Sequence, residues 1–573
     1  MKNIVTVIRN SGLNIALFLC SILVLSSILF LFKIPMSVFN LPISLVISST
    51  IVFYLMKKDK NLHLYLWTIL CSLFIIFLSV FISGEIYDVS YDGNAYHKDA
   101  IALLKNGWNP VYEGSDDFYK RSELRDQEII NSHAMWEDHY AKTGWIIGSS
   151  IYINTNNIET AKAVNLLMMF VCFSLIFSYL YIKLKSIILP LIIGLAAAVN
   201  PISIVQAFSF YNDGLLSMTL FALITAMVMF YDKKRKISDN ETYFWIFSLL
   251  VICVNIKFTG LGLAGLYCVL IYTLFVIREI KDKKYNNIIK PTIIFVISTV
   301  IAILLVGSSS YVKNTIEHEH PFHPIFGEEK VDIITGMQPD SFKYMNNSQK
   351  LFFSIFSETD NIMATLTDKD PKPKIPFTTS RLEVSKLLDT DMRIGGFGVW
   401  FSGIFLLSLI ICIISFAKYY ENKDKTFPII SSLFLLTLAI MFLLTDGWWA
   451  RYAPHIYFLV ILALIALSYN LSANPNVFNK ISFLIFTILV VGNMMFFVVG
   501  NIKPNFLESR RTSYNFSNLK NNYSEVTIAM PDRNFAGVLF NVDDLNIKFD
   551  ISSVRTENDF PLYCHFITYR PIN

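Results

Sequence analysis

The sequence predicts an all-α polytopic membrane protein, and two observations support this fold class. Hydrophobic residues make up 54% of the 573 residues and charged residues only 16%, whereas a soluble domain usually carries about 25% charged residues. Apolar runs of about 20 residues, the length that crosses a bilayer as a helix, recur along the chain. These observations exclude a soluble globular fold.

The runs predict a bundle of about thirteen transmembrane helices, and we expect residues 1–500 to form this membrane domain. Two long polar segments, 84–162 and 312–396, interrupt the series as outer loops. Residues 501–573 contain the strand-like stretches EVTIAM, GVLFNV and LNIKFDI between turn signals, which predict a small extracytoplasmic α/β or β segment. The expected spans lie near 13–33, 38–56, 64–83, 163–182, 186–206, 213–231, 242–257, 258–277, 291–311, 397–417, 427–445, 455–471 and 480–500.

Basic residues predict the orientation of the bundle. Lys and Arg are concentrated in connections that alternate along the thirteen runs, so all of them fall on one side of the membrane. By the positive-inside rule that side is cytoplasmic, together with the N-terminus, and the C-terminus lies outside. Abundant Lys, Asn and Ile indicate a bacterial chain, so we expect the inner (plasma) membrane. The basic connections are KKDK (57–60), KLK (183–185), DKKRK (232–236), REIKDKK (278–284) and KYYENKDK (418–425).

The first outer loop holds the densest group of polar and ionisable residues. Asp88 and Asp92 lie four residues apart just beyond the third run, and Asp92 opens the pattern Asp-Gly-x-x-Tyr-His that ends at Tyr96 and His97. A partly desolvated carboxylate at a membrane boundary can act as a general base. The alternative is a solvated acid that only marks the end of a span.

Three further ionisable residues interrupt short outer connections. Asp213 lies in QAFSFYNDG, Lys257 in VNIKFTG and Arg451 in DGWWARYAP. Ionisable groups this close to the membrane interior are costly and are often functional. The alternatives are a helix cap for Asp213, a side chain that reaches the lipid headgroups for Lys257 and an aromatic anchor for the segment around Arg451.

The histidines and cysteines give no recognisable metal motif. His318, His320 and His323 lie within six residues of one another, but their spacing matches no standard zinc pattern, and prolines break the segment. His133, Glu137 and His139 could meet in space without forming HExxH. Six of the seven cysteines fall in apolar runs, so no disulfide framework is expected. The sequence predicts no certain cofactor, and a divalent metal stays open.

Several motifs together resemble the GT-C superfamily of membrane glycosyltransferases, which use polyprenyl-phosphate-linked sugars. The likeness covers about residues 84–460 and is strongest to bacterial relatives of protein O-mannosyltransferases and aminoarabinose lipid A transferases. Two departures are the position of the loop, which follows the third span rather than the first, and the lack of an Asp-x-Asp or Asp-Glu pair in it. The motifs are YDGNAYHKDAI, NGWNPVYE, SFYNDG, NIKFTG, YVKNTIEHEHPFHPIFG and WWARYAP.

The resemblance implies a role for each candidate residue. Asp92 would be the catalytic base, with Asp88 and Asp213 as the other catalytic acids, and Lys257 and Arg451 would bind the donor phosphate. The expected partners are a polyprenyl-phosphate-linked sugar, a glycan, lipid or protein acceptor and the lipid bilayer, with no nucleic acid. The expected substrate contacts are Tyr91, Tyr96, His97, Tyr211 and His323.

Two other function classes remain open at this point. A surface polysaccharide polymerase or ligase would depend on outer-loop residues such as Arg381, Arg393 and His323. A lipid or glycan transporter would carry charged residues within its spans. The runs are nearly free of charge and the ionisable residues gather at outer turns, which favours an enzyme.

Overall fold

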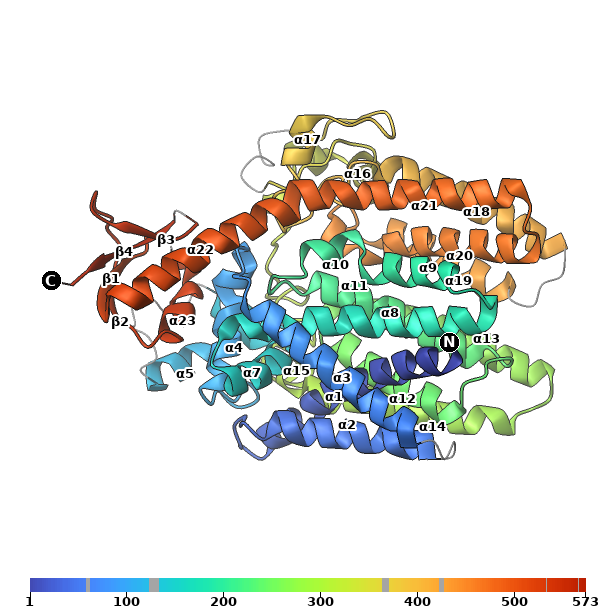
Figure 1. The fold of residues 1–573 in the computed structure, drawn as a ribbon, viewed down its shortest axis with the longest axis horizontal. Helices are drawn as coiled ribbons and strands as arrows, with labels where there is room; N and C mark the ends of the chain where they lie inside the picture. The colour runs from blue at the N-terminus through green and yellow to red at the C-terminus, as the bar shows by residue number, and fades with distance from the viewer. Residues whose placement is uncertain are drawn as a thin grey trace.

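The computed structural model describes residues 1–57, 62–122, 133–362, 370–421, 427–531, 533–564 and 566–572. Its apolar helices run roughly side by side, and a small sheet lies at one end of the bundle, where the chain finishes (Figure 1). The helices of the bundle are α1 Lys2–Leu31, α2 Asn40–Met56, α3 Leu62–Gly84, α8 Ala163–Leu184, α9 Ile188–Ala198, α10 Pro201–Val205, α11 Asp213–Tyr231, α12 Asp239–Val254, α13 Phe258–Lys281, α14 Asn286–Val300, α18 Phe401–Glu421, α19 Phe427–Leu443, α20 Phe458–Ala473 and α21 Val477–Phe497.

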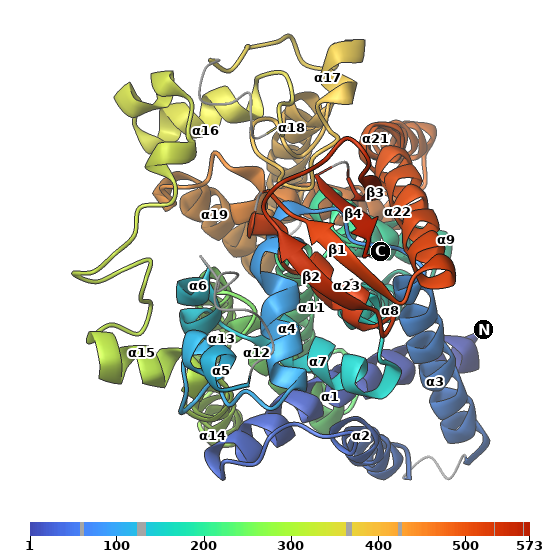
Figure 2. The same ribbon diagram turned by 90° about the vertical axis from the view of Figure 1, so that its left-hand side faces the viewer.

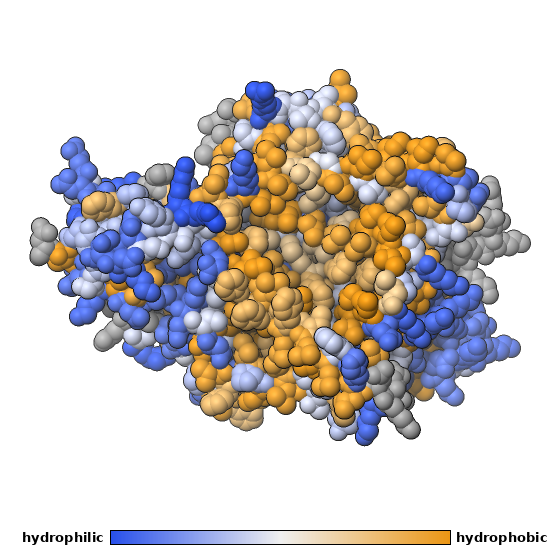
Figure 3. All heavy atoms as spheres, in the orientation of Figure 1, coloured by the Kyte–Doolittle hydropathy of each residue, from blue (hydrophilic) through white to orange (hydrophobic). Residues whose placement is uncertain are grey.

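Among the described residues, eight helices are long and apolar enough to cross a membrane, and four shorter apolar helices accompany them. These helices indicate a multi-pass membrane protein, although the expected count of about thirteen spans is not confirmed. Apolar side chains form a band across the middle of the molecule between two hydrophilic ends (Figure 3). Helix α3 contributes Phe74, Phe77 and Phe81, whose exposed fractions are 60%, 67% and 55%, as expected of side chains that face lipid.

The buried centre of the bundle consists of helices that are hydrophobic on all sides. In α11 the most apolar stretch is 83% buried, and in α1 the corresponding value is 72%. A helix that is apolar all round is covered either by neighbouring helices or by lipid. Helices α1, α8, α11 and α12 supply that mutual cover, and α3 and α14 lie at the periphery.

Three of the basic connections meet at one end of the bundle. Lys183 forms an ion pair with Asp232, and Lys233 lies 3.0 Å from the carboxylate of Asp282. The connections 183–185, 232–236 and 278–284 therefore lie on the same side, as the alternation predicts. Residues 58–60 and 422–425, which belong to the other two basic connections, lie outside the described residues.

The polar segments fold into short helices at the opposite end of α11 and α13. The first segment contains a π-turn, η2, and several short helices packed against one another, and the second segment contains α15 to α17. These elements are η2 Gly93–His97, α4 Lys98–Lys105, α5 Ser115–Ser122, α6 Ala134–His139, α7 Thr143–Thr155, η4 Ile158–Lys162, α15 Tyr311–His318, α16 Asn347–Ile355 and α17 Arg381–Ser385.

The C-terminal segment is a four-stranded mixed sheet with strand order β2-β1-β4-β3. Strands β1 and β2 are parallel, and the other two pairings are antiparallel. The helix that leads into it runs from Val477 to Asn522 through a π-turn at Val498–Ile502, so the boundary expected at 500/501 falls inside a helix. The remaining elements are α22 Lys503–Asn522, β1 Glu525–Ala529, α23 Val538–Asp543, β2 Lys548–Ser552, β3 Phe560–Tyr563 and β4 Ile567–Pro571.

The strand-like stretches have two different outcomes. EVTIAM contains β1 and LNIKFDI contains the first four residues of β2, as predicted, but GVLFNV forms most of the helix α23. Val538, Leu539 and Val542 of this helix join the core of the C-terminal segment. The prediction of a strand for GVLFNV is wrong because tertiary packing overrides β-propensity in a short apolar stretch.

The sheet docks onto the first outer segment (Figure 2). The Gly537 amide donates to the Asn94 carbonyl at 2.8 Å, and the Tyr563 hydroxyl donates to the Asp88 carbonyl at 2.9 Å. A Cβ atom on Gly537 would lie 2.7 Å from the Asn94 carbonyl oxygen, so only glycine permits this approach. The start of α23 and the end of β3 thereby hold the backbone on either side of Asp92.

Candidate functional site

Side chains from four separate connections meet at the outer-segment end of the bundle. Arg451 Nη1 lies 3.0 Å from Asp92 Oδ2 and 3.5 Å from Asp213 Oδ2. Lys257 forms an ion pair with the other oxygen of Asp213. The structure therefore brings together four residues that the sequence singles out independently, although Asp92 and Arg451 are 359 positions apart.

A third carboxylate, that of Asp391, completes this group. Arg451 Nε lies 2.8 Å from Asp391 Oδ1, and Trp449 Nε1 donates to the same oxygen at 2.8 Å. Arg393 donates from Nε and Nη2 to Asp391 Oδ2 at 2.9 and 2.7 Å. We call Asp92, Asp213, Lys257, Asp391 and Arg451 the Arg451 cluster.

Asp391 is not among the candidates that the sequence singles out, although its surroundings contain a signal. Residues 389–393 read Asp-Thr-Asp-Met-Arg, an Asp-x-Asp pair that lies in the second polar segment rather than in the first. Burial, followed by the charge of Asp391, raises the pKa of Asp389 to about 6. The second segment therefore contributes acidic residues of its own to this region.

The Arg451 cluster has a buried side and an accessible side. The side chain of Asp213 is 1% exposed and that of Arg451 is 8% exposed, whereas Asp92 and Lys257 are each 18% exposed. Buried charges persist in a fold only when they are paired, because desolvation of an ion costs several kcal/mol. A substrate reaching the cluster would therefore meet Asp92 and Lys257 first.

Aromatic rings line the cationic side chains. The Arg451 guanidinium lies 4.9 Å from the ring centroid of Tyr211 and 4.8 Å from that of Tyr452. Lys257 Nζ lies 4.8 Å from the Tyr452 ring. These are cation–π distances, and the rings restrict the directions in which the two cations can face.

Local geometry argues against the simpler interpretations of these residues. The Asp213 carboxylate accepts from Gln206 Nε2 at 3.2 Å and pairs with Lys257, so it does not cap α11. Trp448 and Trp449 are 1% and 3% exposed, which excludes an aromatic anchor in the lipid headgroups. The Lys257 side chain turns to a carboxylate rather than to the membrane surface.

Asp88 has a different environment from Asp92. It is 1% exposed, and its carboxylate accepts from the Ser90 amide at 2.8 Å, the Ser90 hydroxyl at 2.9 Å and the Phe210 amide at 3.0 Å. Burial raises its pKa. A Cβ atom on Gly93 would lie 1.9 Å from Asp88 Oδ2, which explains the glycine after Asp92. The contacts of Asp88 are those of a residue that joins the loop to the turn before α11.

The expected substrate contacts are divided among several surroundings. His97 is buried, accepts at Nδ1 from Trp145 Nε1 at 2.6 Å and lies 6.4 Å from the Tyr211 ring. Burial, with help from Lys257 and Arg451, lowers the pKa of His97 to about 3, so this imidazole is neutral at physiological pH. The Tyr96 ring lies tilted beside it, with the ring centroids 4.3 Å apart. Tyr91 instead packs edge-on against Phe535 of the C-terminal segment at 5.5 Å.

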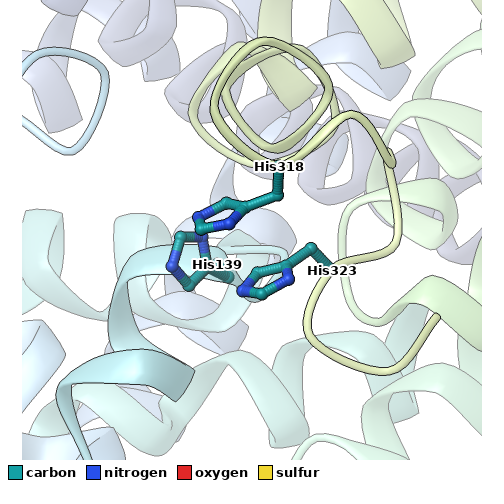
Figure 4. Close-up of side chains that lie close together, drawn as sticks. All are labelled: His139, His318 and His323. Carbon is teal, nitrogen blue, oxygen red and sulfur yellow. The ribbon is translucent and has the colours of Figure 1, made fainter. Parts of the chain in front are cut away.

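His323 lies in a separate group with His139 and His318 (Figure 4). The His318 and His323 rings stack with centroids 3.7 Å apart, and the His139 ring meets both edge-on at 4.7 and 4.6 Å. In the sequence, His320 lies between His318 and His323. In the structure, His320 packs against Phe326, and His139 joins the other two instead. We call His139, His318 and His323 the three-His cluster.

A second buried ionic group, centred on Glu159, joins the C-terminal segment to the bundle. Lys98 Nζ lies 2.7 Å from Glu159 Oε1, and Lys162 pairs with the other oxygen. Asn541 of α23 donates to Glu159 Oε1 at 3.0 Å and accepts from Lys98 at 2.8 Å. The Asp88 amide donates to Glu159 Oε2 at 3.0 Å, so this group also fixes the loop before Asp92.

A small apolar hollow of about 60 Å³ lies between α10 and the helix that leads to the sheet. It reaches from Phe208 to Asp88 and Thr390, the residue next to Asp391. Its apolar lining is formed by Ile86, Val89, Ile204, Val205, Phe208, Ile502 and Phe506.

Comparison with known proteins gives no match: no family model fits the chain, and no curated protein or solved structure is similar to it.

Proposed function

We propose that this protein is an integral membrane glycosyltransferase of the GT-C type. It transfers a sugar from a polyprenyl-phosphate donor to the hydroxyl of an extracytoplasmic glycan, lipid or protein. The observation that carries the proposal is the Arg451 cluster, because carboxylates and cations from five connections converge at one end of an apolar bundle. A base beside two phosphate-binding cations is what this transfer requires.

The positions of charge along the bundle support the proposed orientation. Helix α11 has 19 residues and is about 28 Å long, close to the roughly 30 Å of hydrocarbon in a bilayer. Asp213 begins this helix and Asp232, with its basic neighbours, follows its end. We assign the basic end to the cytoplasm by the positive-inside rule, which puts the Arg451 cluster on the outer face of a membrane crossed by about thirteen helices.

The proposed chemistry is a single displacement. The acceptor oxygen forms a bond to the anomeric carbon while the bond from that carbon to the phosphate oxygen breaks, and the acceptor proton passes to the Asp92 carboxylate. The polyprenyl phosphate departs with its negative charge beside Arg451 and Lys257, which stabilise it. One displacement inverts the anomeric carbon.

The ion pair between Asp92 and Arg451 gives this mechanism a regulating step. The Arg451 guanidinium lies 3.0 Å from the Asp92 carboxylate, and a base so paired accepts a proton poorly. A donor phosphate competes for the same guanidinium, since Arg binds phosphate and carboxylate oxygens with the same planar fork. Donor binding would thereby release Asp92 for the acceptor.

The neighbouring groups fit the two ends of such a donor. The apolar hollow beside Asp88 and Thr390 offers an environment for the first isoprene units.

Arg393, which a polymerase or ligase would use, is held by two bonds to Asp391, so the structure offers no reason to prefer that alternative.

The test compares donor classes on the purified full-length protein. Polyprenyl-phosphate sugars should support transfer, and nucleotide sugars should not. Polyprenyl phosphate alone should raise the melting temperature, whereas polyprenol, which lacks only the phosphate, should not. Efficient transfer from a nucleotide sugar with no lipid carrier present would refute the proposal.

A further inference from the structure

We propose that the three-His cluster is a binding site for a zinc ion that joins the two outer segments. One ligand atom from each of His139, His318 and His323 lies within 4.8 Å of the other two. The site is distinct from the Arg451 cluster, and it rests on its own geometry rather than on the proposed transferase activity.

The ligands come from parts of the chain that no local motif connects. His139 ends α6 in the first outer segment, His318 ends α15, and His323 lies in the turn that follows α15. Figure 4 shows the three rings close together between the two segments. A metal bound there would tie residues 134–139 to residues 311–323, as a structural zinc ion does in many small domains.

Hydrogen bonds orient the rings for coordination. His139 Nδ1 bonds to Asn314 Oδ1 at 2.8 Å, and His318 Nδ1 bonds to Glu329 Oε2 at 2.8 Å. Since these acceptors require a proton on Nδ1, they leave the lone pair of each neutral ring on Nε2. Metal-binding histidines show this pattern, in which the second nitrogen donates to a carboxylate or an amide oxygen.

Asn314 also holds the backbone of the cluster. Its Nδ2 donates to the carbonyls of His139 and His323 at 3.1 and 2.9 Å, and its side chain is fully buried. A buried asparagine that bonds to two of the three ligand residues and orients the ring of one of them fixes their spacing. Packing of three histidine rings alone would not require these hydrogen bonds.

The donor set and spacing select the metal. Three imidazoles suit zinc, copper or nickel, whereas calcium and magnesium prefer oxygen ligands. Zinc–nitrogen bonds of 2.0–2.1 Å put the nitrogens of a tetrahedral site about 3.3 Å apart, so the rings need to close by at most roughly 1.5 Å. The stacked His318 and His323 rings also need to turn out of their parallel planes so that both lone pairs face one ion. Three protein ligands leave a fourth position for water or an anion.

Metal binding would also steady the region near the Arg451 cluster. Tyr140 follows His139, and its ring meets Phe258 at 5.9 Å, next to Lys257. Lys142 Nζ donates to the Asp138 and Tyr140 carbonyls at 2.9 and 2.8 Å. The segment after α6 is therefore tied to residues that flank the cluster.

The experiment uses the full-length protein, purified without a polyhistidine tag and stripped with a chelator. Titration with zinc chloride, followed by calorimetry and metal analysis after desalting, should give one zinc per chain and a higher melting temperature. His139→Ala, His318→Ala and His323→Ala should each weaken binding at least tenfold. His320→Ala is the matched control from the same segment and should bind like the wild type.

Outer acceptors provide a second comparison. Glu329→Gln should weaken zinc binding about tenfold, because loss of an outer acceptor typically costs 10–100-fold in affinity, and the neighbouring Glu328→Gln should not. Where an alanine variant fails to fold, zinc protection of the wild-type histidines from diethylpyrocarbonate gives the answer. Failure of the wild type to retain zinc, absence of protection, or equal loss in His320→Ala would overturn the proposal. None of these readouts depends on sugar transfer.

Discussion

Asp92→Asn separates catalysis from stability more sharply than any other substitution in the Arg451 cluster. Asparagine has the shape of aspartate and keeps an oxygen for Arg451 Nη1, which now lies 3.0 Å from Oδ2. Asp213 and Asp391 remain beside the guanidinium. The substitution therefore removes little except the negative charge and the ability to accept a proton.

The two expected effects differ in size. Replacing one charge-assisted hydrogen bond by a neutral one should lower the free energy of unfolding by about 1 kcal/mol, because Asp92 is 18% exposed and Arg451 keeps two other carboxylates. Loss of a general base should lower the turnover rate about 10²–10⁴-fold, which corresponds to roughly 3–5 kcal/mol in the activation free energy.

The assay measures turnover with the donor that supports transfer, together with the melting temperature in the same detergent. Asp391→Asn is the matched control, because the same guanidinium loses the same kind of partner. Asp391 is 7% exposed and lies beside two arginines, so its substitution should cost more stability and leave more activity. Near-wild-type turnover of Asp92→Asn, or a melting temperature as low as that of Asp391→Asn, would refute the assignment of Asp92 as the base.

Other predictions test the supporting structure. Glu159→Gln leaves two buried lysines without their carboxylate and should cost about 3–5 kcal/mol of stability, measured by denaturation; the exposed pair broken by Glu508→Gln should cost at most about 1 kcal/mol. The raised pKa of Asp389 stabilises the fold at low pH, and this contribution is lost as pH rises from about 4 through about 6. Asp389→Asn should therefore flatten the melting temperature between pH 4 and pH 7, and an unchanged pH dependence would argue against it. A single cysteine in place of Tyr344, which is exposed, should react with a membrane-impermeant thiol reagent in intact cells. A single cysteine in place of Lys234, which is also exposed, should react only after permeabilisation. The reverse pattern would overturn the orientation.

The sequence predicts best those features that a local pattern can encode. Apolar runs of spanning length identify the helices of the bundle. Four ionisable residues stand out because each lies at the edge of such a run, where a charged group costs free energy and is often functional. They are Asp92, Asp213, Lys257 and Arg451. The alternation of the spans predicts that all four face the same side of the membrane. It does not predict their meeting in one cluster, since that requires the packing of four connections.

Features that depend on contacts between distant segments are not predicted by any local sequence pattern. Asp391 lies in a long polar segment, where a solvated acid is the ordinary expectation, and only contact with Arg451 distinguishes it. Lys98 belongs to the stretch KDAIALLK, and its burial depends on Glu159 and Asn541, 61 and 443 positions away. Likewise His139, rather than the nearby His320, completes the three-His cluster because α6 packs beside α15.

The docking of the C-terminal sheet has a consequence for biosynthesis. Asp92 leaves the ribosome early, but the backbone beside it is fixed by Gly537 and Tyr563, which are made more than four hundred residues later. During translation the loop therefore lacks these two partners until the C-terminal residues have been made. A chain that stops before residue 537 would lack both hydrogen bonds, so the backbone around Asp92 reaches its final set of contacts only after the C-terminal segment has been made.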